Sequence, residues 1–284
     1  FSDVGSDLKI ETTSLSFTLR KLENEEYPEA FLRSHEENEN TQEVLVSELF
    51  DSIKNVGIAS TPEGGRPVLT GVYFNNREEK TELAATDSYR LATQEISSFP
   101  IDDVGIISFR SLSEVIRLFE NEESTLKINS NEKDLYFFND KYFASLRKVE
   151  GSFPEYQNLF PKETLFTAEV NKNEILECLD RSTVVAEGYI PVTFIFENND
   201  LLKITTLNKD VGGGNEELKV KILGVETGDI DGFQMSFNPS FLIQGIEVLE
   251  GNKAYFRFSG NEKPVVIQGD SENYKYLLMP VRAS

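Results

Sequence analysis

The residue types that most often carry catalysis or bind metals are scarce in this sequence of 284 residues, which holds one histidine, His35, and one cysteine, Cys178. Catalysis of the Ser-His-Asp or Cys-His kind needs a base beside the nucleophile, and a structural zinc site needs several Cys or His ligands. His35 lies in an acidic segment and Cys178 in an apolar one. We therefore expect a solvated histidine and a buried thiol rather than either kind of site.

Acidic side chains offer another route to catalysis, because two carboxylates can act as acid and base or hold a cation. The sequence has 49 Asp and Glu against 28 Lys and Arg, a formal net charge of −21. None of these acids stands in a recognisable metal-binding loop, and Gly212-Gly213-Gly214 lacks the Lys-Ser/Thr of a phosphate-binding loop, which favours a flexible turn. The sequence indicates a protein that is not an enzyme, with no cofactor and no metal.

The charge also restricts the partners and the location. A net charge of −21 argues against general coating of DNA or of an anionic membrane, so any contact with nucleic acid must be local. The chain has no run of about 18 apolar residues, and residues 1–11 lack the pattern of a signal peptide. We therefore expect a cytoplasmic protein with no membrane partner.

The elements that must position any site recur along the chain. An amphipathic helical pattern at residues 45–56 has a counterpart at residues 175–183. Each is followed by two predicted strands joined by an Asn-Asn turn, Asn75-Asn76 in the first copy and Asn198-Asn199 in the second. The second copy repeats the first with a shift of 122 to 130 residues.

A second helix is predicted in each copy, begun by a capping residue. Ser111 is the expected cap in the first copy, and Asn238, followed by Pro239, in the second. A loop at residues 212–214 accounts for the longer spacing in the second copy. Amphipathic helices and alternating strands hide their apolar faces against each other. The pattern predicts an α+β fold of repeated units, each with two helices packed on an antiparallel sheet.

Three segments carry more information than the repeat. Residues 66–72 read RPVLTGV and lead into residues 85–92, ATDSYRLA; residues 153–156 read FPEY, and residues 276–282 read YLLMPVR. In this order and spacing they resemble the bacterial sliding clamp, the beta subunit of DNA polymerase III. The resemblance covers the whole chain and implies the DNA clamp fold and the function of a processivity factor.

The resemblance also divides the chain into parts. Residues 1–29 are similar to the end of the family's first domain, residues 37–162 to its second domain and residues 163–284 to its third. Most of the first domain is absent. We therefore expect either a fragment of a longer protein or a chain whose first domain was lost.

The first function that the resemblance implies is topological. Clamps of this family form a head-to-tail homodimeric ring whose helices line a hole around duplex DNA and whose sheets form the outer wall. A ring needs only a few inward cations to tolerate phosphates. By helix position we nominate as DNA contacts Lys54, Arg110, Arg117, Lys172 and Arg181. The ring contact of related clamps matches Phe17, Leu19, Val184 and Val185.

The second implied function is the docking of short linear motifs from the replicative polymerase, the clamp loader and repair proteins. In similar clamps a hydrophobic pocket between the second and third domains binds these peptides, since leucine, valine and methionine walls bury aliphatic and aromatic anchors. The matching positions here are Leu69, Thr86, Ser88, Tyr89, Arg90, Leu91, Pro154, Leu159, Asn238, Phe241, Leu277, Met279, Pro280, Val281 and Arg282. Ser88-Tyr89 stands where the family often has Gly-His, and Asn158 where it often has a basic residue, so partner preference is expected to differ.

Two alternatives to a ring stay open at this point. The chain could be a truncated, monomeric adaptor that keeps the peptide pocket and does not encircle DNA, because a strand without its home domain leaves an exposed edge. A third interpretation is an enzyme of unknown class on the repeated α+β scaffold.

Overall fold

The computed structural model describes residues 1–21, 40–62, 64–77, 80–97, 99–120, 125–185, 190–208, 212–224 and 230–282. It contains two compact units, Phe1–Asn40 and Thr41–Ser284. His35 lies outside the described residues. Within the described residues, no helix is long and apolar enough to cross a membrane.

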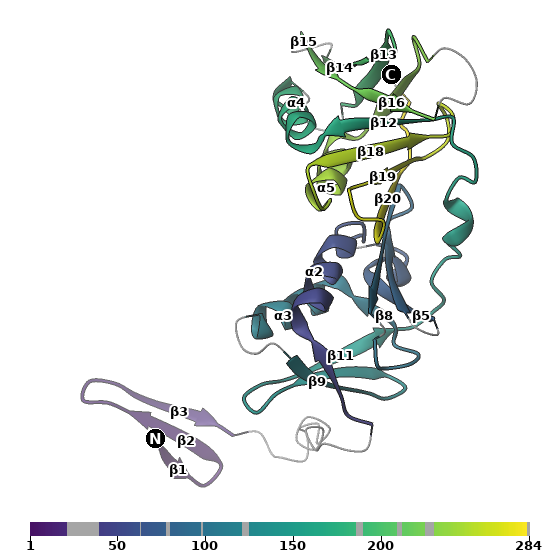
Figure 1. The fold of residues 1–284 in the computed structure, drawn as a ribbon. Helices are drawn as coiled ribbons and strands as arrows, with labels where there is room; N and C mark the ends of the chain where they lie inside the picture. The colour runs from purple at the N-terminus through teal and green to yellow at the C-terminus, as the bar shows by residue number, and fades with distance from the viewer. Residues whose placement is uncertain are drawn as a thin grey trace. The chain divides into compact units, whose positions relative to one another are not determined.

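The first unit contains a three-stranded antiparallel sheet in the order β1-β2-β3 (Figure 1). The strands are β1 (Ser2–Val4), β2 (Asp7–Glu11) and β3 (Ser16–Arg20). β3 is an edge strand, and its Phe17 and Leu19 side chains are 54% and 50% exposed. An edge with exposed apolar side chains can pair with another chain.

The second unit is built on a sheet of 13 strands and a sheet of four. The long sheet has the order β16-β12-β18-β19-β20-β7-β6-β5-β8-β11-β10-β9-β4, and the short one β15-β14-β13-β17. The strands of its first half are β4 (Gln42–Leu45), β5 (Gly71–Arg77), β6 (Lys80–Thr86), β7 (Arg90–Ser97), β8 (Gly105–Ser108), β9 (Thr125–Ser130), β10 (Asp134–Phe138) and β11 (Phe143–Val149). Those of its second half are β12 (Phe166–Asn171), β13 (Val192–Glu197), β14 (Leu201–Asn208), β15 (Gly212–Lys219), β16 (Lys221–Leu223), β17 (Gln234–Phe237), β18 (Lys253–Phe258), β19 (Val265–Gln268) and β20 (Tyr274–Leu278).

The predicted repeat is present in the order of the elements. The helices are α2 (Val46–Gly57) and α3 (Phe109–Phe119) in the first half and α4 (Lys172–Val185) and α5 (Pro239–Glu247) in the second. They lie on one side of the long sheet (Figure 1). Asn238 caps α5 as predicted, because its side chain accepts hydrogen bonds from the backbone N–H of Ser240 and of Phe241.

Three local predictions are wrong. The cap of α3 is Ser108, without a side-chain hydrogen bond, and Ser111 lies inside the helix. Asn75-Asn76 is not a turn, since both residues belong to β5 and pair with Glu82 and Thr81 of β6. The segment 212–214 is not a loop but the start of β15, which pairs with the end of β14. Ladder hydrogen bonds to a neighbouring strand outweigh the turn preference of Asn and Gly in the last two cases.

The helices and sheets enclose apolar side chains in both halves. In the first half, Leu49 and Ile53 of α2 are 1% and 0% exposed. In the second half, the Phe166 and Phe258 rings stack with centroids 4.8 Å apart. Each such side chain contributes about 1.5–3 kcal/mol by leaving water. Cys178 is 5% exposed, and burial raises the pKa of its thiol, which confirms the predicted buried cysteine.

Candidate functional site

Two segments far apart in sequence meet where β7 pairs with β20, so the two halves of the unit share one sheet (Figure 1). Leu91 lies opposite Leu277 in this antiparallel pair. The ladder continues past the strands, because the Met279 N–H donates to the Tyr89 carbonyl at 2.9 Å. The Val281 N–H then donates to the carbonyl of Ser236, next to α5, at 2.9 Å. The predicted C-terminal segment therefore connects residues 86–91 with the second half of the unit.

Asp87 shapes the turn that leads into β7. Its Oδ1 accepts from the backbone N–H of Tyr89 at 2.9 Å and of Arg90 at 3.0 Å. The Thr86 hydroxyl donates to the Arg90 carbonyl at 2.6 Å and accepts from the Ser88 N–H at 3.2 Å. Ser88 has a φ of 79°, in the left-handed region that favours glycine. The tight turn leaves the Tyr89 side chain 66% exposed beside the C-terminal segment.

Arg90 joins the two halves from within. Its Nε donates to Asp87 Oδ2 at 2.9 Å, and its NH1 donates to Gln244 Oε1 at 2.5 Å and to the Tyr276 hydroxyl at 3.4 Å. The guanidinium carbon lies 4.0 Å from the centroid of the Phe241 ring, in cation–π geometry. Arg90 is 7% exposed. We call the junction of the β7–β20 pair with α5 the seam, and the Arg90 guanidinium holds this seam together.

The Tyr276 ring packs against α5 because Gly245 has no side chain. A Cβ on Gly245 would lie 2.4 Å from the Tyr276 ring. The Tyr276 hydroxyl donates to the Phe241 carbonyl of α5 at 2.9 Å. Burial raises the pKa of Tyr276 to about 12, although the positive charge of Arg90 lowers it. The tyrosine therefore stays a neutral hydrogen-bond donor at physiological pH.

The apolar residues predicted for the pocket fall into two groups. Leu91 and Leu277 are 1% and 2% exposed and pack together with Ala84 and Tyr156 beneath the surface. The exposed group is Tyr89, Leu159, Met279 and Val281, at 66%, 50%, 38% and 36%. Exposed apolar side chains gathered at one place mark binding sites.

The remaining residues predicted for the pocket differ in burial and in hydrogen bonding. Leu69 is buried at the end of the 3-10 turn Pro67–Leu69, and Pro154 is exposed in the segment before the 3-10 turn Gln157–Leu159. Asn238 uses its side-chain oxygen for the cap of α5. Within the described residues, Leu69 and Asn238 make no hydrogen bond to the C-terminal segment. Pro280 is half-buried and Arg282 is exposed.

The sequence did not predict a role at the seam for two residues, Tyr156 and Gln244. Tyr156 stands in the FPEY motif, so its place in the sequence was noted but its role was not. Gln244 lies 154 residues from its partner Arg90, and its position in α5 carries no local signal.

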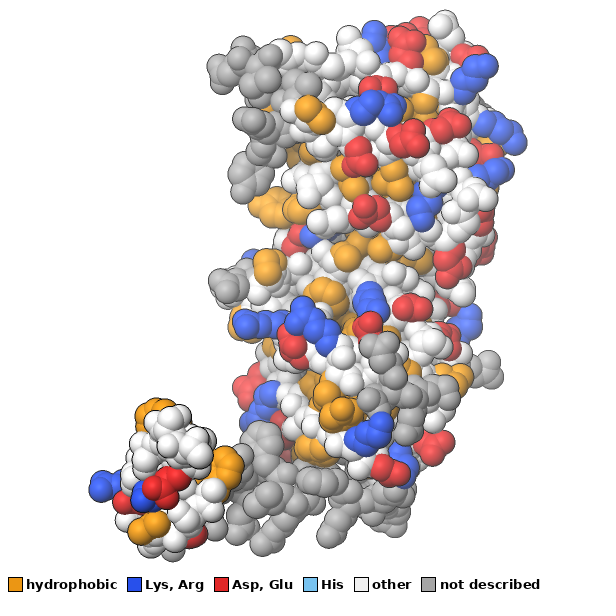
Figure 2. All heavy atoms as spheres, turned by 90° about the vertical axis from the view of Figure 1, so that its left-hand side faces the viewer, with side chains coloured by type: hydrophobic (Ala, Val, Ile, Leu, Met, Phe, Trp, Pro, Cys, Tyr) orange, Lys and Arg blue, Asp and Glu red, His pale blue; other side chains and the backbone are white. Residues whose placement is uncertain are grey.

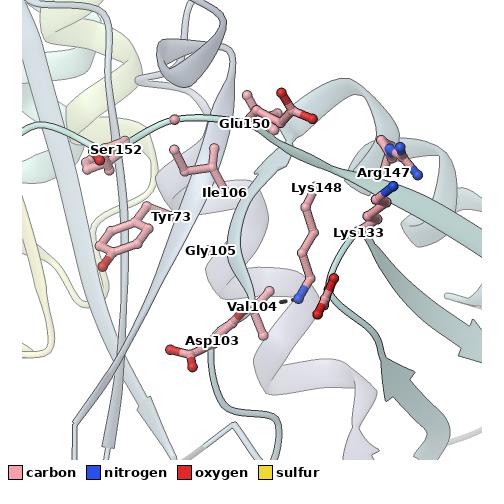
Figure 3. Close-up of a pocket in the computed structure, with 14 residues that line it drawn as sticks. Tyr73, Asp103, Val104, Gly105, Ile106, Lys133, Arg147, Lys148, Glu150 and Ser152 are labelled. Atoms are coloured by element: carbon pink, nitrogen blue, oxygen red, sulfur yellow. Dashed lines mark hydrogen bonds between the residues drawn. The ribbon is translucent and has the colours of Figure 1, made fainter.

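A hollow of about 400 Å³ lies beside the segment that carries Pro154, and it does not include the predicted pocket residues (Figure 3). Figure 3 shows Lys148 reaching toward the backbone at Asp103, where its Nζ donates to the carbonyl at 3.0 Å. Burial lowers the pKa of Lys148. The cations of the wall are Lys133, Arg147 and Lys148, and its acids are Asp103, Glu132 and Glu150. The wall of the hollow therefore carries charges of both signs.

The helix side carries both signs of charge, with Lys and Arg interspersed among Asp and Glu (Figure 2). Lys54 Nζ lies 3.6 Å from a Glu120 oxygen, and Arg117 NH1 lies 3.0 Å from a Glu114 oxygen. Both pairs are exposed, so each contributes at most about 1 kcal/mol. Arg110 of α3 is exposed. These cations are accessible to a phosphate.

Two other nominated cations have stronger internal partners. Lys172 Nζ donates to the carbonyls of Glu247 and Leu249, at 2.9 and 2.6 Å, and so satisfies the C-terminal end of α5. Arg181 makes two hydrogen bonds of 3.0 Å to the Glu216 carboxylate, and this contact lowers the pKa of Glu216. Lys172 and Arg181 are therefore weaker candidates for phosphate contact.

Among the residues matched to the ring contact, Val184 is 79% exposed near the end of α4. The side chain of Val185 lies outside the described part of the chain. Within the described residues, no group of His, Cys, Asp or Glu could hold a metal ion.

Known proteins match this chain over almost its whole length. The family model for the DNA polymerase III beta subunit, central domain, matches residues 43–155, and that for the C-terminal domain matches residues 157–282. The beta sliding clamp of Streptomyces coelicolor is 30% identical over 95% of this chain and 73% of the relative. The beta sliding clamp of Synechococcus elongatus is 24% identical over 94% of this chain and 71% of the relative.

Solved structures agree on the fold. The DNA polymerase III subunit beta from Pseudomonas aeruginosa, 20% identical, has a TM-score of 0.84 and is matched over 99% of this chain and 76% of that chain. The sliding clamp from Bacillus subtilis, 23% identical, also has a TM-score of 0.84, over 98% and 73%. These structures confirm the predicted α+β clamp fold. The two family models and the Streptomyces relative show that the chain belongs to the beta sliding clamp family.

Proposed function

We propose that this chain works as a DNA sliding clamp, a non-catalytic processivity subunit that encircles duplex DNA and tethers polymerases, the clamp loader and repair proteins. Family membership favours this function over the monomeric adaptor and over an enzyme. The observation that carries the tethering role is the pairing of β7 with β20, which brings exposed Tyr89, just before β7, next to Met279, just after β20, with exposed Val281 two residues further on. The proposed location is the cytoplasm.

The proposed ring assigns the chain to three clamp domains. Residues 1–29 would end a first clamp domain, and residues 37–162 and 163–284 would be the second and third. Phe17, Leu19 and Val184 are exposed apolar side chains of the kind that a homodimeric ring contact would cover. Size-exclusion chromatography with light scattering tests ring formation, since a dimeric mass supports the ring and a monomer at micromolar concentration contradicts it.

The peptide site would use a buried floor and an exposed rim. Leu91 and Leu277 form a rigid floor that a peptide does not have to order, and Tyr89, Leu159, Met279 and Val281 can close over an apolar anchor. A preorganised floor lowers the entropy cost of binding. The unbranched Met279 side chain adapts to anchors of different shape.

Met279→Ala should weaken peptide binding by more than about 1 kcal/mol, because it removes a central apolar contact. Isothermal titration with a peptide that has leucine and phenylalanine anchors measures this change. Leu118→Ala is the matched control, since Leu118 is 37% exposed on α3 and Met279 is 38% exposed at the seam. Equal affinity of Met279→Ala and wild type, with binding by both, would refute the pocket assignment.

A further inference from the structure

The wall of the proposed pocket is formed in part by a segment without regular secondary structure. Residues 150–156 connect β11 to the 3-10 turn Gln157–Leu159, and they include Gly151, whose φ is 119°. Pro154 and Leu159 both belong to this stretch. An irregular segment presents its side chains reproducibly only if specific contacts hold it in place.

The Tyr156 side chain makes such contacts. It is 1% exposed, and its hydroxyl donates to Glu82 Oε1 at 2.5 Å and accepts from Asn75 Nδ2 at 3.0 Å. Asn75 and Glu82 lie opposite each other on β5 and β6. The hydroxyl is therefore held by two neighbouring strands at once.

The ring of Tyr156 reaches the seam. It packs in a cluster with Ala84 of β6, Leu91 of β7 and Leu277 of β20. Leu91 and Leu277 are the buried floor of the proposed peptide site. The Tyr156 side chain thus contacts the floor and belongs to the segment that supplies Pro154 and Leu159. The Leu159 N–H donates to the Tyr156 carbonyl at 3.0 Å.

Phe153 completes the attachment at the other end of the segment. Its ring lies edge-on to Tyr156, with centroids 5.8 Å apart, and stacks on Tyr73 of β5 with centroids 5.0 Å apart. Figure 3 shows Tyr73 beside the backbone at Ser152, at the edge of the hollow. These aromatic contacts hold the start of the segment, in addition to the hydrogen bonds of the Tyr156 hydroxyl.

We propose that Tyr156 is a positioning residue for peptide binding: its bonds to Glu82 and Asn75 fix the 153–159 segment so that Pro154 and Leu159 face the Leu91–Leu277 floor. This inference rests on the proposed function. Tyr156 does not touch the peptide. Its effect is to keep the wall and the floor in one arrangement before a peptide arrives, which lowers the cost of binding.

Tyr156→Phe keeps the ring and removes only the hydroxyl. We expect the dissociation constant of a labelled peptide with leucine and phenylalanine anchors to rise at least about fivefold. Amide hydrogen exchange at residues 153–159 should become faster while α4 and α5 remain protected. Retention on circular DNA should not change, because the helix side is untouched.

Two further variants separate positioning from a general loss of stability. Tyr136→Phe is the control, since the Tyr136 hydroxyl accepts from Asn131 of the turn between β9 and β10 and not from β5 or β6. Glu82→Gln keeps an oxygen that accepts the tyrosine bond and should bind the peptide nearly as wild type, whereas Glu82→Leu should reproduce the defect of Tyr156→Phe.

The outcomes are distinguishable. If wild type binds the peptide and Tyr156→Phe binds it equally well, or if Tyr136→Phe is equally impaired, Tyr156 is not a positioning residue. If wild type binds no such peptide, the proposed pocket itself fails. Weakened binding with faster exchange confined to the segment supports the inference.

Discussion

At the scale of single residues, Ser88 holds a backbone conformation that favours glycine. A left-handed backbone costs a non-glycine residue about 1–2 kcal/mol, and Ser88 adopts it with a φ of 79°. Glycine would remove that cost but lose more entropy on folding, about 0.5–1 kcal/mol. The first effect is the larger, so the turn at Ser88 retains strain.

Ser88→Gly should therefore stabilise the protein by up to about 1 kcal/mol. Urea unfolding should show a higher midpoint with an unchanged slope. Ser111→Gly, inside α3, is the control and should destabilise by about 0.5 kcal/mol or more, because glycine disfavours a helix. A lower midpoint for both variants would mean that the Ser88 turn is not strained.

At the scale of elements, the β7–β20 pair and α5 are held together through Arg90. Its planar guanidinium bonds to Asp87 and Gln244 while it stacks on Phe241. A lysine carries the same charge but has neither the planar shape nor the several donors. The contacts of this arginine thus depend on its shape as well as its charge.

Arg90→Lys should lower the free energy of unfolding by about 2 kcal/mol, since charged hydrogen bonds contribute about 1.5–3 kcal/mol and the half-buried Asp87 and Gln244 each lose a donor. Urea unfolding checks the value. Arg257→Lys is a control outside the seam, on β18. If Arg90→Lys loses peptide affinity at unchanged stability, Arg90 acts on the peptide rather than on the seam.

At the scale of the whole molecule, a chain of net charge −21 presents mixed charges on its helix side (Figure 2). Lys54, Arg117 and Arg181 each lie close to a carboxylate. A phosphate must compete with these carboxylates, so electrostatic attraction to DNA is weak. Retention on DNA would then depend on encirclement, which needs no strong contact.

We expect loaded protein to stay on circular duplex DNA and to leave once the DNA is linearised, over a wide range of salt. Arg110→Ala with Arg117→Ala should reduce the slope of log affinity against log salt for a short linear duplex by about 2, or about 0.9 per phosphate contact. Lys275→Ala is the control, because Lys275 lies on the opposite face of β20 from Tyr276, which contacts α5. If the slope of log affinity against log salt is the same for wild type and all variants, Arg110 and Arg117 do not contact DNA.

The sequence alone determined the repeat and the α+β fold, and the resemblance to a known family indicated which segments meet at the seam. Periodicity encodes which face of a helix or strand is buried, and Asn238 with Pro239 signals a helix start within a few residues. The fold class, the α5 cap and the buried Cys178 are all local or periodic properties, which explains why they were predictable.

Tertiary structure alone decided how the side chains are used. Arg90 bonds to Gln244 across 154 residues and Arg181 bonds to Glu216 across 35, in addition to the outside partners that the sequence predicts for both cations. Residues 212–214 form a strand because they pair with the end of β14 in an antiparallel sheet. Such pairings depend on packing between distant segments, and no local pattern records them. Which cation is accessible, and which tyrosine holds the pocket wall, followed only from the folded chain.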